Sequence, residues 1–258
     1  MIHPFFKYQG TGNDFIMIDN RQSLFSKNDA KLVATLCDRR FGIGGDGLIL
    51  LENDEMSDFK MVYFNADGNE GSMCGNGGRC TVAFAKYLNI ISDKAVFTAV
   101  DGRHDAKIEN GTISLQMQNV SEISRKKDAV FLDTGSPHHV QMVENIEDFE
   151  VYKEGKKIRY GIYGQSGSNI NFVTQRDDTS FSVRTYERGV EDETLSCGTG
   201  VTAVALAMHH TGKTTANKVV IETQGGTLNV EFEEEGGNYK NIQLSGPAKL
   251  VFKGEIEC

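Results

Sequence analysis

Apolar and polar residues alternate in short runs along most of the chain, and turns rich in glycine, asparagine and aspartate separate the runs. Such alternation is typical of β-strands that bury one face. The strand-like runs are residues 5–8, 16–18, 48–51, 59–63, 96–98, 106–108 and 113–117 in the first half, and 130–132, 182–186, 219–221, 227–232, 242–244 and 250–252 in the second. The runs from 96 to 117 predict an antiparallel meander.

Two segments break this alternation. Residues 81–88 and 201–208 are rich in alanine, lack proline and are apolar on nearly every side, which predicts two buried helices. Each follows a Cys-Gly-polar-Gly motif: Cys74-Gly75-Asn76-Gly77 in the first half and Cys197-Gly198-Thr199-Gly200 in the second. A thiol at a helix N-terminus meets unpaired backbone N–H groups and the positive end of the helix dipole, and both effects lower a thiol pKa. We therefore expect two thiols with lowered pKa values that share an anionic ligand.

A further helix is expected before the glycine-rich stretch 42–47. Ser26 is its candidate N-cap, with Asp29 three residues later and apolar residues 32, 33 and 36 at helical spacing. Cys37 in this helix and Cys80 on the first buried helix are interpreted as core residues. Residues 42–47 match GxGxxG, but a helix precedes them and a strand follows, which is the reverse of a dinucleotide-binding fingerprint.

The second half repeats the plan of the first, because 169–172 resembles 12–15 and each half carries one cysteine motif and one buried helix. We interpret this as an internal duplication. The N-terminal domain is expected to span residues 1–118, with strand 247–258 as a candidate addition, and the C-terminal domain 119–246. Residues 118–127 are polar and mark the boundary.

Composition narrows the class of protein. The chain has 258 residues, 39% of them hydrophobic, a net charge of -9 and no basic block, so neither nucleic acid nor an anionic membrane is expected as a partner. No apolar run reaches the length of a membrane span, and no signal peptide is expected. The five cysteines contain no CxxC pair, which argues against a disulfide framework or a metal site. Reduced thiols in the cytoplasm fit this usage, and Cys258 is expected to fray.

Two thiols on opposite sides of one α-carbon can invert its configuration. One thiolate removes the α-proton while the other thiol donates a proton to the opposite face. Because an α-proton is far less acidic than a thiol, the site must stabilise the charge that develops on the carboxylate, and helix N-termini can do this. Asn13, Asp14 and Asn65 lie in loops nearby, although taken alone their stretches also read as turns.

Taken together, the motifs resemble the diaminopimelate epimerase family. They are, in order, residues 12–15, 44–47, 64–68, 74–77 with 79–80, 135–138, 169–172, 186–189 and 197–200. The resemblance implies an α/β (α+β) fold of two pseudo-symmetric domains, each a mostly antiparallel sheet wrapped around a central helix. It implies interconversion of LL- and meso-diaminopimelate for lysine and peptidoglycan synthesis, with no cofactor and no metal.

The same resemblance implies roles for individual residues. Cys74 and Cys197 match the catalytic pair, and His138 and Glu187 match residues that tune the thiols. The positions that match substrate-binding residues are Asn13, Asn65, Gly75, Asn76, Asn169, Glu187, Arg188, Gly198 and Thr199. Two positions depart from the family pattern: Gly47 stands where a glutamine side chain is common, and Ser136 where an asparagine is common. A structural role is the alternative for His138, and it is the expectation for His139.

Other interpretations stay open at this point. A related cofactor-independent racemase could act on proline, hydroxyproline or histidine, but Arg188 and the three asparagines favour a substrate with a second polar end. A binding protein without turnover would not need both cysteines. A pyridoxal-phosphate enzyme would need a lysine that neither cysteine loop carries. We expect a small amino acid as the only ligand, and a homodimer is left open.

Overall fold

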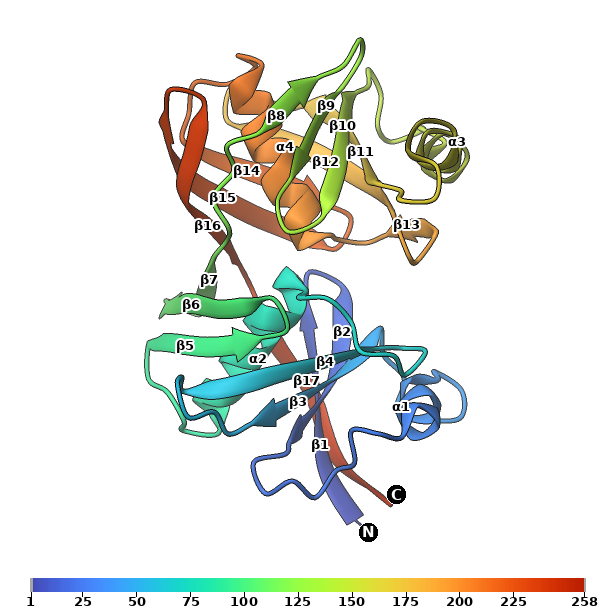
Figure 1. The fold of residues 1–258 in the computed structure, drawn as a ribbon, viewed down its shortest axis with the longest axis vertical. Coiled ribbons are helices and arrows are strands. Elements are labelled where there is room, and N and C mark those ends of the chain that lie inside the picture. The colour runs from blue at the N-terminus through green and yellow to red at the C-terminus, as the bar shows by residue number, and fades with distance from the viewer. Residues whose placement is uncertain (1, 258) are drawn as a thin grey trace. The chain divides into compact units, whose positions relative to one another are not determined.

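The computed structural model describes residues 2–257, so the expectation for Cys258 lies outside the described residues. The chain forms two compact units (Figure 1). Unit 1 runs from the N-terminus to Leu115 and resumes at Gly246, and unit 2 comprises Gln116–Ser245. Each unit consists mostly of sheet with two helices; the mostly β character was predicted, and so were three of these four helices.

The sheet of unit 1 follows from the alternating runs. Its strands, in chain order, are β1 Ile2–Gly10, β2 Asn13–Asp19, β3 Gly47–Glu52, β4 Phe59–Asn65, β5 Lys94–Ala99, β6 Gly102–Glu109, β7 Thr112–Gln116 and β17 Lys249–Glu257. Strand β17 pairs with β1, and from there each strand pairs with the next in chain order up to β7. The pairs β2–β3 and β4–β5 are parallel and the others are antiparallel.

Parallel neighbours require a crossover, and each crossover of unit 1 contains a helix. Helix α1 (Ala30–Cys37) lies between β2 and β3, and α2 (Gly75–Tyr87) lies between β4 and β5. Helix α1 packs its apolar stripe, which includes Val33 and Leu36, against β2 and β3. Helix α2 contacts β1, β2, β3 and β4 and is buried along most of its length.

Unit 2 repeats this plan. Its strands are β8 Ile123–Arg125, β9 Val130–Asp133, β10 Pro137–Met142, β11 Asn169–Gln175, β12 Ser180–Glu187, β14 Lys218–Thr223, β15 Gly226–Glu235 and β16 Asn238–Gly246, with a short β13 (Asp192–Thr194) paired to β12. The pairs β10–β11 and β12–β14 are parallel, and helices α3 (Val151–Tyr163) and α4 (Gly198–His210) cross between them. The two units therefore share one order of pairings and crossovers, as expected if the second half repeats the plan of the first.

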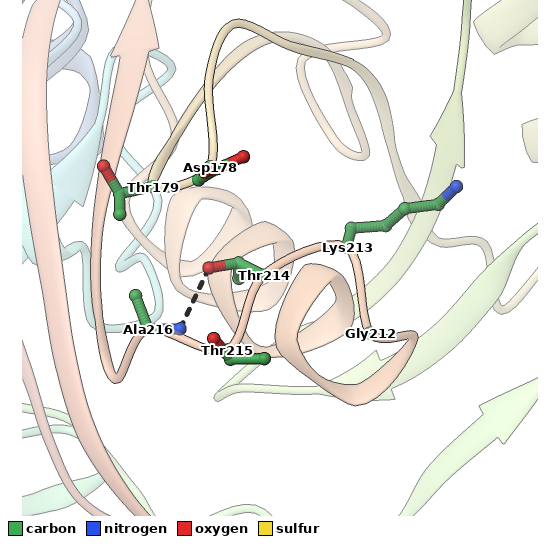
Figure 2. Close-up of a pocket in the computed structure, with 7 residues that line it drawn as sticks. All are labelled: Asp178, Thr179, Gly212, Lys213, Thr214, Thr215 and Ala216. Carbon is green, nitrogen blue, oxygen red and sulfur yellow. Dashed lines mark hydrogen bonds between the residues drawn. The ribbon is translucent and has the colours of Figure 1, made fainter.

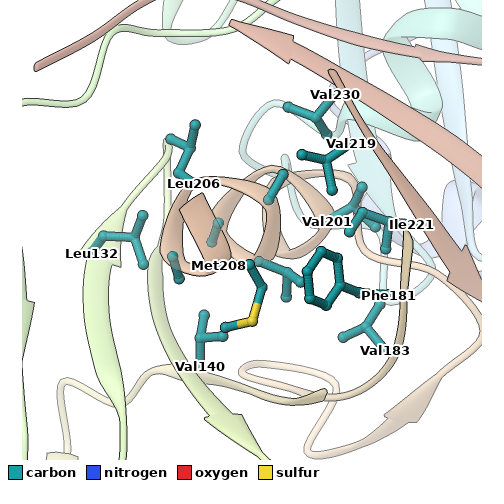
Figure 3. Close-up of a cluster of buried hydrophobic side chains, with 14 of the residues drawn as sticks. Leu132, Val140, Phe181, Val183, Val201, Leu206, Met208, Val219, Ile221 and Val230 are labelled. Carbon is teal, nitrogen blue, oxygen red and sulfur yellow. The ribbon is translucent and has the colours of Figure 1, made fainter. Parts of the chain in front are cut away.

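The core of unit 2 surrounds α4 (Figure 3). Leu206 and Met208 on the helix pack among strand residues such as Val140, Phe181 and Ile221, all of them nearly inaccessible to solvent. Burial of one such side chain contributes about 1.5–3 kcal/mol to the free energy of unfolding. The apolar helix sequence therefore fixes α4 inside its sheet, and with it the position of the residue that precedes the helix.

Two local expectations need correction. The first helix does not begin at Ser26: it begins at Ala30, because Asp29 is the N-cap and accepts a hydrogen bond from the Leu32 backbone N–H at 2.9 Å. Helix α3 was missing from the expected elements. Only one side of it is buried, and it contains Gly155, where a Cβ would lie 2.4 Å from Cβ of Tyr186. Close packing on β12, rather than helix propensity, explains this helix.

Candidate active site

Cys74 is the N-cap of α2. Its backbone is extended, with φ -112° and ψ 118°, and its carbonyl accepts the first helical hydrogen bond, from the Gly78 N–H at 2.7 Å. The helix begins close to the sheet, because a Cβ on Gly77 would lie 3.0 Å from Cδ1 of Ile49 and 3.2 Å from Cε of Met61. The glycines of the motif thus let the N-terminus of α2, and Cys74 with it, sit directly against β3 and β4.

Asn13 and Asn76 share a hydrogen-bonded cluster with Cys74. Sγ of Cys74 lies 3.5 Å from Oδ1 of Asn13, and Nδ2 of Asn76 donates to the same oxygen at 3.3 Å. Nδ2 of Asn13 donates to Oδ2 of Asp46 at 2.6 Å. Since a carboxylate only accepts, Asp46 fixes the orientation of the Asn13 amide, with Oδ1 toward the sulfur. The turn itself is made by Thr11 and Gly12, which have positive φ, so Asn13 begins β2 rather than forming the turn.

The glycine-rich loop 42–47 braces this cluster. Asp14 forms ion pairs with Lys7 at 2.8 Å and Arg39 at 2.7 Å, and Arg39 also pairs with Asp46 at 2.8 Å. Burial alone would raise the pKa of Asp14, but hydrogen bonds from Arg39 and Lys7 hold it well below its usual range. The loop follows α1 and leads into β3, which is the context expected for a structural loop and not for a dinucleotide fingerprint.

Asn65 ends β4 and is exposed. Its carbonyl accepts from the Gly68 N–H at 2.9 Å, so the turn interpretation holds for the backbone, while the side chain stays at the end of the strand. Gly47 is its partner across β3 and β4. A Cβ on Gly47 would lie 2.5 Å from both the Phe64 carbonyl oxygen and Cε2 of Tyr63. The ring of Tyr63 therefore fills the space beside Gly47, which accounts for the absence of a side chain at this position.

Cys197 has the same construction in unit 2. It is the N-cap of α4, with φ -123° and ψ 112°, and its carbonyl accepts from the Val201 N–H at 2.9 Å. A Cβ on Gly200 would lie 2.6 Å from Oδ1 of Asn171, so this glycine too allows a close approach to the strands. Sγ of Cys197 lies 3.5 Å from Oγ1 of Thr199.

His138 reaches this motif through Thr199. Its Nε2 lies 2.9 Å from Oγ1 of Thr199, and Nδ2 of Asn171 lies 3.2 Å from its Nδ1. Because Nδ2 of Asn171 also donates to the His139 carbonyl, Nδ1 of His138 accepts and Nε2 carries the proton. Burial, and secondarily the charge of Arg188, lower the pKa of His138 to about 3, so the imidazole is neutral. Nδ1 of His139 lies 2.9 Å from the Tyr163 hydroxyl, which fits the structural role expected of it.

Asn169, Ser136 and Arg188 form a second cluster in unit 2. Oδ1 of Asn169 accepts from the Arg188 backbone N–H at 2.8 Å, and its Nδ2 donates to Oγ of Ser136 at 3.1 Å. The guanidinium of Arg188 donates to Oγ of Ser136 at 3.4 Å and to the Ser166 carbonyl at 3.0 Å. Arg188 is exposed, and no carboxylate between residues 2 and 257 pairs with it. Glu187 accepts a hydrogen bond from Thr194 at 2.9 Å.

Sequence reasoning gave no role to Asp46, Asn171 or Arg79, although all three lie in motifs that it named; Arg79 joins the Cys74 cluster by donating to Oδ1 of Asn76 at 2.9 Å. Asn171 belongs to the Asn-x-Asn-Phe motif, so its spacing was a usable signal. Asp46 becomes relevant only because the loop 42–47 folds back onto Asn13, which no local pattern reveals. Arg79 was signalled by its position, since it is a charged residue in a helix that is otherwise apolar or small.

A separate pocket lies beyond the end of α4 that is remote from Cys197 (Figure 2). It is lined by Asp178, Thr179, Gly212, Lys213, Thr214, Thr215 and Ala216. None of the expected site residues lines it, and Oγ1 of Thr214 already accepts a hydrogen bond from the Ala216 N–H at 3.0 Å.

In the described part of the chain no helix is long and apolar enough to cross a membrane. Within the same residues no cluster of three or more His, Cys, Asp or Glu side chains could hold a metal ion.

Comparison with known proteins gives consistent matches over nearly the whole chain. The family model described as diaminopimelate epimerase matches residues 5–123 and 130–251. A diaminopimelate epimerase of Flavobacterium psychrophilum is 63% identical over 253 residues, covering 97% of this chain and 99% of that protein. The corresponding protein of Chlorobaculum tepidum is 43% identical over 257 residues, covering 96% of this chain and 98% of that protein.

Solved structures of lower identity show the same fold. A PhzF-family phenazine biosynthesis protein of Bacillus anthracis has a TM-score of 0.81 at 14% identity and covers 100% of both chains. A hydroxyproline epimerase of Agrobacterium vitis has a TM-score of 0.72 at 11% identity, covering 99% of this chain and 92% of that one. These likenesses confirm the predicted two-domain α+β fold, and at such identities they are evidence for the fold alone.

Proposed function

The chain belongs to the diaminopimelate epimerase family, and from this premise we propose that it is an isomerase that interconverts LL- and meso-2,6-diaminopimelate. We further propose that Cys74 and Cys197 transfer the proton. The main observation that supports this mechanism is that the two thiols occupy matching positions, one in each unit. Each is the N-cap of a 13-residue buried helix whose first turn contains glycines pressed against the sheet.

The helix N-termini suit a carboxylate. Backbone N–H groups at the start of a helix lack helical partners, and the dipole adds positive potential at the same point. In our proposal Gly75 and Asn76 from unit 1 and Gly198 and Thr199 from unit 2 hold the carboxylate of the reacting amino acid. These donors would strengthen their interaction as the carboxylate takes on enediolate character, so they would stabilise the transition state more than the substrate.

Proton transfer then needs one base and one acid on opposite faces. One cysteine, as the thiolate, removes the α-proton, and the other, as the thiol, gives its proton to the opposite face of the planar carbon. The configuration inverts, and the two cysteines exchange their protonation states. A single base would return the proton to the face from which it came, so the presence of two matched thiols favours inversion.

In our proposal the cluster around Arg188 binds the second end of the substrate. A planar guanidinium can bind a carboxylate through two parallel hydrogen bonds. Arg188 is held by Ser136 and Ser166 and has no carboxylate partner in residues 2–257, and Asn169 orients its backbone. We propose that Arg188 binds the distal carboxylate, with Asn13, Asn65, Asn169 and Glu187 as further substrate contacts.

The proposed reaction needs no cofactor, because the thiols carry the proton and the helix N-termini stabilise the charge. We place it in the cytoplasm, in the synthesis of lysine and of peptidoglycan precursors. The substrate would be the only partner that the reaction requires, and neither nucleic acid nor membrane enters it.

A labelling experiment in heavy water tests both the substrate and the mechanism. Purified protein is incubated with LL-diaminopimelate, and the α-proton signal is followed by proton NMR. In the first turnovers the meso product should carry deuterium at the inverted centre while recovered substrate carries little. Equal early labelling of both would indicate a single base and contradict the two-thiol mechanism.

Matched variants and substrates complete this test. Cys74→Ser and Cys197→Ser should each abolish epimerisation, whereas Cys37→Ser, which changes a buried thiol packed in the α1 core, should retain it. Proline, hydroxyproline and histidine serve as alternative substrates. Exchange with one of these and none with diaminopimelate would reassign the substrate within the same fold.

A further inference from the structure

Arg79 is a wholly buried arginine in the second turn of α2, the helix that Cys74 begins. Its side chain has no measurable exposure to solvent. The guanidinium donates to Oδ1 of Asn76 at 2.9 Å, to Oγ1 of Thr11 at 3.3 Å, and to the carbonyls of Gly75 and Pro247, both at 3.4 Å. All of these acceptors are neutral, and no carboxylate in residues 2–257 forms an ion pair with it. A buried charge without a counter-charge is strongly destabilising, so its retention calls for a reason.

A need to shape the cysteine loop does not explain why a buried arginine stands at position 79. In unit 2 the residue at the same distance after the cysteine is Thr202, and its hydroxyl donates to the Gly198 carbonyl at 3.1 Å. Arg79 makes the corresponding bond to the Gly75 carbonyl. A neutral threonine therefore supports the same kind of loop around Cys197. What Arg79 adds in unit 1 is a positive charge.

The other charges around this loop do not supply the missing negative charge. The titratable groups that lie around Arg79 and Cys74 are Lys7 and Tyr8 on β1, Asp14 on β2, Arg39 and Asp46 before β3, and Cys80 on α2. Two of them are cationic and two anionic, and they pair with one another through Asp14 and Asp46. Burial raises the pKa of Tyr8 well above its usual range, and burial raises the pKa of Cys80 to about 12, so both are neutral.

Cys74 is then the remaining group that can balance Arg79. It is half-buried at a helix N-terminus, where backbone N–H groups favour an anion. Burial lowers the pKa of Arg79 to about 10, and a Cys74 thiolate would partly offset that effect. Arg79 thus stays protonated near neutral pH. Asn13 Oδ1 favours the protonated thiol, but sulfur is a weak donor and the contact is 3.5 Å long, so the buried charge outweighs it.

We propose that Arg79 is a positioning residue whose buried charge keeps Cys74 as a thiolate in the resting protein. This inference rests on the proposed function in taking Cys74 as one of the two reacting thiols. It adds an assignment to that function: in the resting protein Cys74 is the base. The two units share a fold and a motif, and the buried arginine of unit 1 has a neutral threonine in its place in unit 2. In our proposal this difference decides where the first negative charge resides.

The test is a titration of thiolate absorbance in the ultraviolet, which needs no substrate. The parent protein minus Cys74→Ser gives the Cys74 signal, and it should show a thiolate at neutral pH. Arg79→Gln retains a donor for Asn76 but removes the charge, and it should move the Cys74 midpoint upward by at least about one pH unit, or slow alkylation at neutral pH about tenfold. Arg79→Lys retains the charge and should keep the low midpoint. Thr202→Val, a change at the corresponding position of unit 2, should leave the Cys74 midpoint unmoved.

Each other outcome overturns the inference. A protonated Cys74 in the parent at neutral pH refutes it without any variant, and this measurement decides the matter if Arg79→Gln fails to fold. An unchanged midpoint in Arg79→Gln, or equal shifts in the Gln and Lys variants, would mean that Arg79 acts through shape alone. A chain that shows the thiolate but exchanges no α-proton of diaminopimelate would refute the proposed function and leave this inference standing.

Discussion

Nε2 of His138 lies 2.9 Å from Oγ1 of Thr199, and that oxygen lies 3.5 Å from Sγ of Cys197. A buried, neutral imidazole therefore reaches the thiol through a single hydroxyl. Because Nε2–H donates to Thr199, the hydroxyl proton of Thr199 can point toward the sulfur and stabilise its thiolate. The hydroxyl, rather than the imidazole, is the group that adjusts Cys197 directly.

Thr199→Val tests this relay. The valine has the shape of threonine but cannot donate to the thiolate, so we expect kcat/KM for diaminopimelate to fall by about threefold to tenfold, the range of one ordinary hydrogen bond. Thr199→Ser keeps the hydroxyl and should recover most of the activity. A Val variant as active as the parent would show that the hydroxyl does not act on Cys197.

The pH dependence of stability should carry a contribution from His138. Its pKa falls from 6.5 in the unfolded chain to about 3 in the folded one, so between these values the unfolded state binds more protons. Stability therefore rises with pH in this window and is lost as the pH falls from about 6.5 toward 3. Urea denaturation at several pH values should show a shallower acid loss in His138→Gln than in the parent. Equal slopes in the two proteins would contradict the low pKa.

Arg188→Lys tests recognition of the distal carboxylate. Lysine keeps the charge but lacks the planar fork. If bound substrate desolvates the carboxylate at Arg188, poor pairing should cost roughly 2–5 kcal/mol of binding. We expect a strong loss of kcat/KM with the fold retained, as judged by circular dichroism. Arg176→Lys is the matched control, because Arg176 lies in the same unit and pairs with Glu147 and Glu222. Parent-like activity in Arg188→Lys would remove Arg188 from the site.

The sequence predicted what repeats locally and missed what folding brings together. Alternation located most of the strands but not β8, β10, β11 or β13. The Cys-Gly-polar-Gly motifs located both N-termini of the buried helices, because each of these signals lies within a few residues. Helix α3 escaped because its buried side is short and one of its contacts is a glycine, Gly155. The Asn13–Asp46 bond joins residues 33 positions apart, and only the packed loop 42–47 makes it possible.

Gly47→Ala measures how tightly β3 and β4 approach beside Tyr63. A Cβ at this position would lie 2.5 Å from the Phe64 carbonyl oxygen, which is backbone and cannot rotate away, and equally close to the Tyr63 ring. Such overpacking typically costs about 1–3 kcal/mol, and we expect a loss of this size in the free energy of unfolding from urea denaturation. Gly102→Ala is a useful contrast, because nothing lies near its Cβ and its cost comes from backbone strain at φ 121°. Adding Tyr63→Ala to Gly47→Ala should relieve only part of the loss, since the carbonyl remains. Full recovery in the double variant would show that the ring alone excludes a side chain at position 47, and a Gly47→Ala protein as stable as the parent would show that the strands can separate without cost.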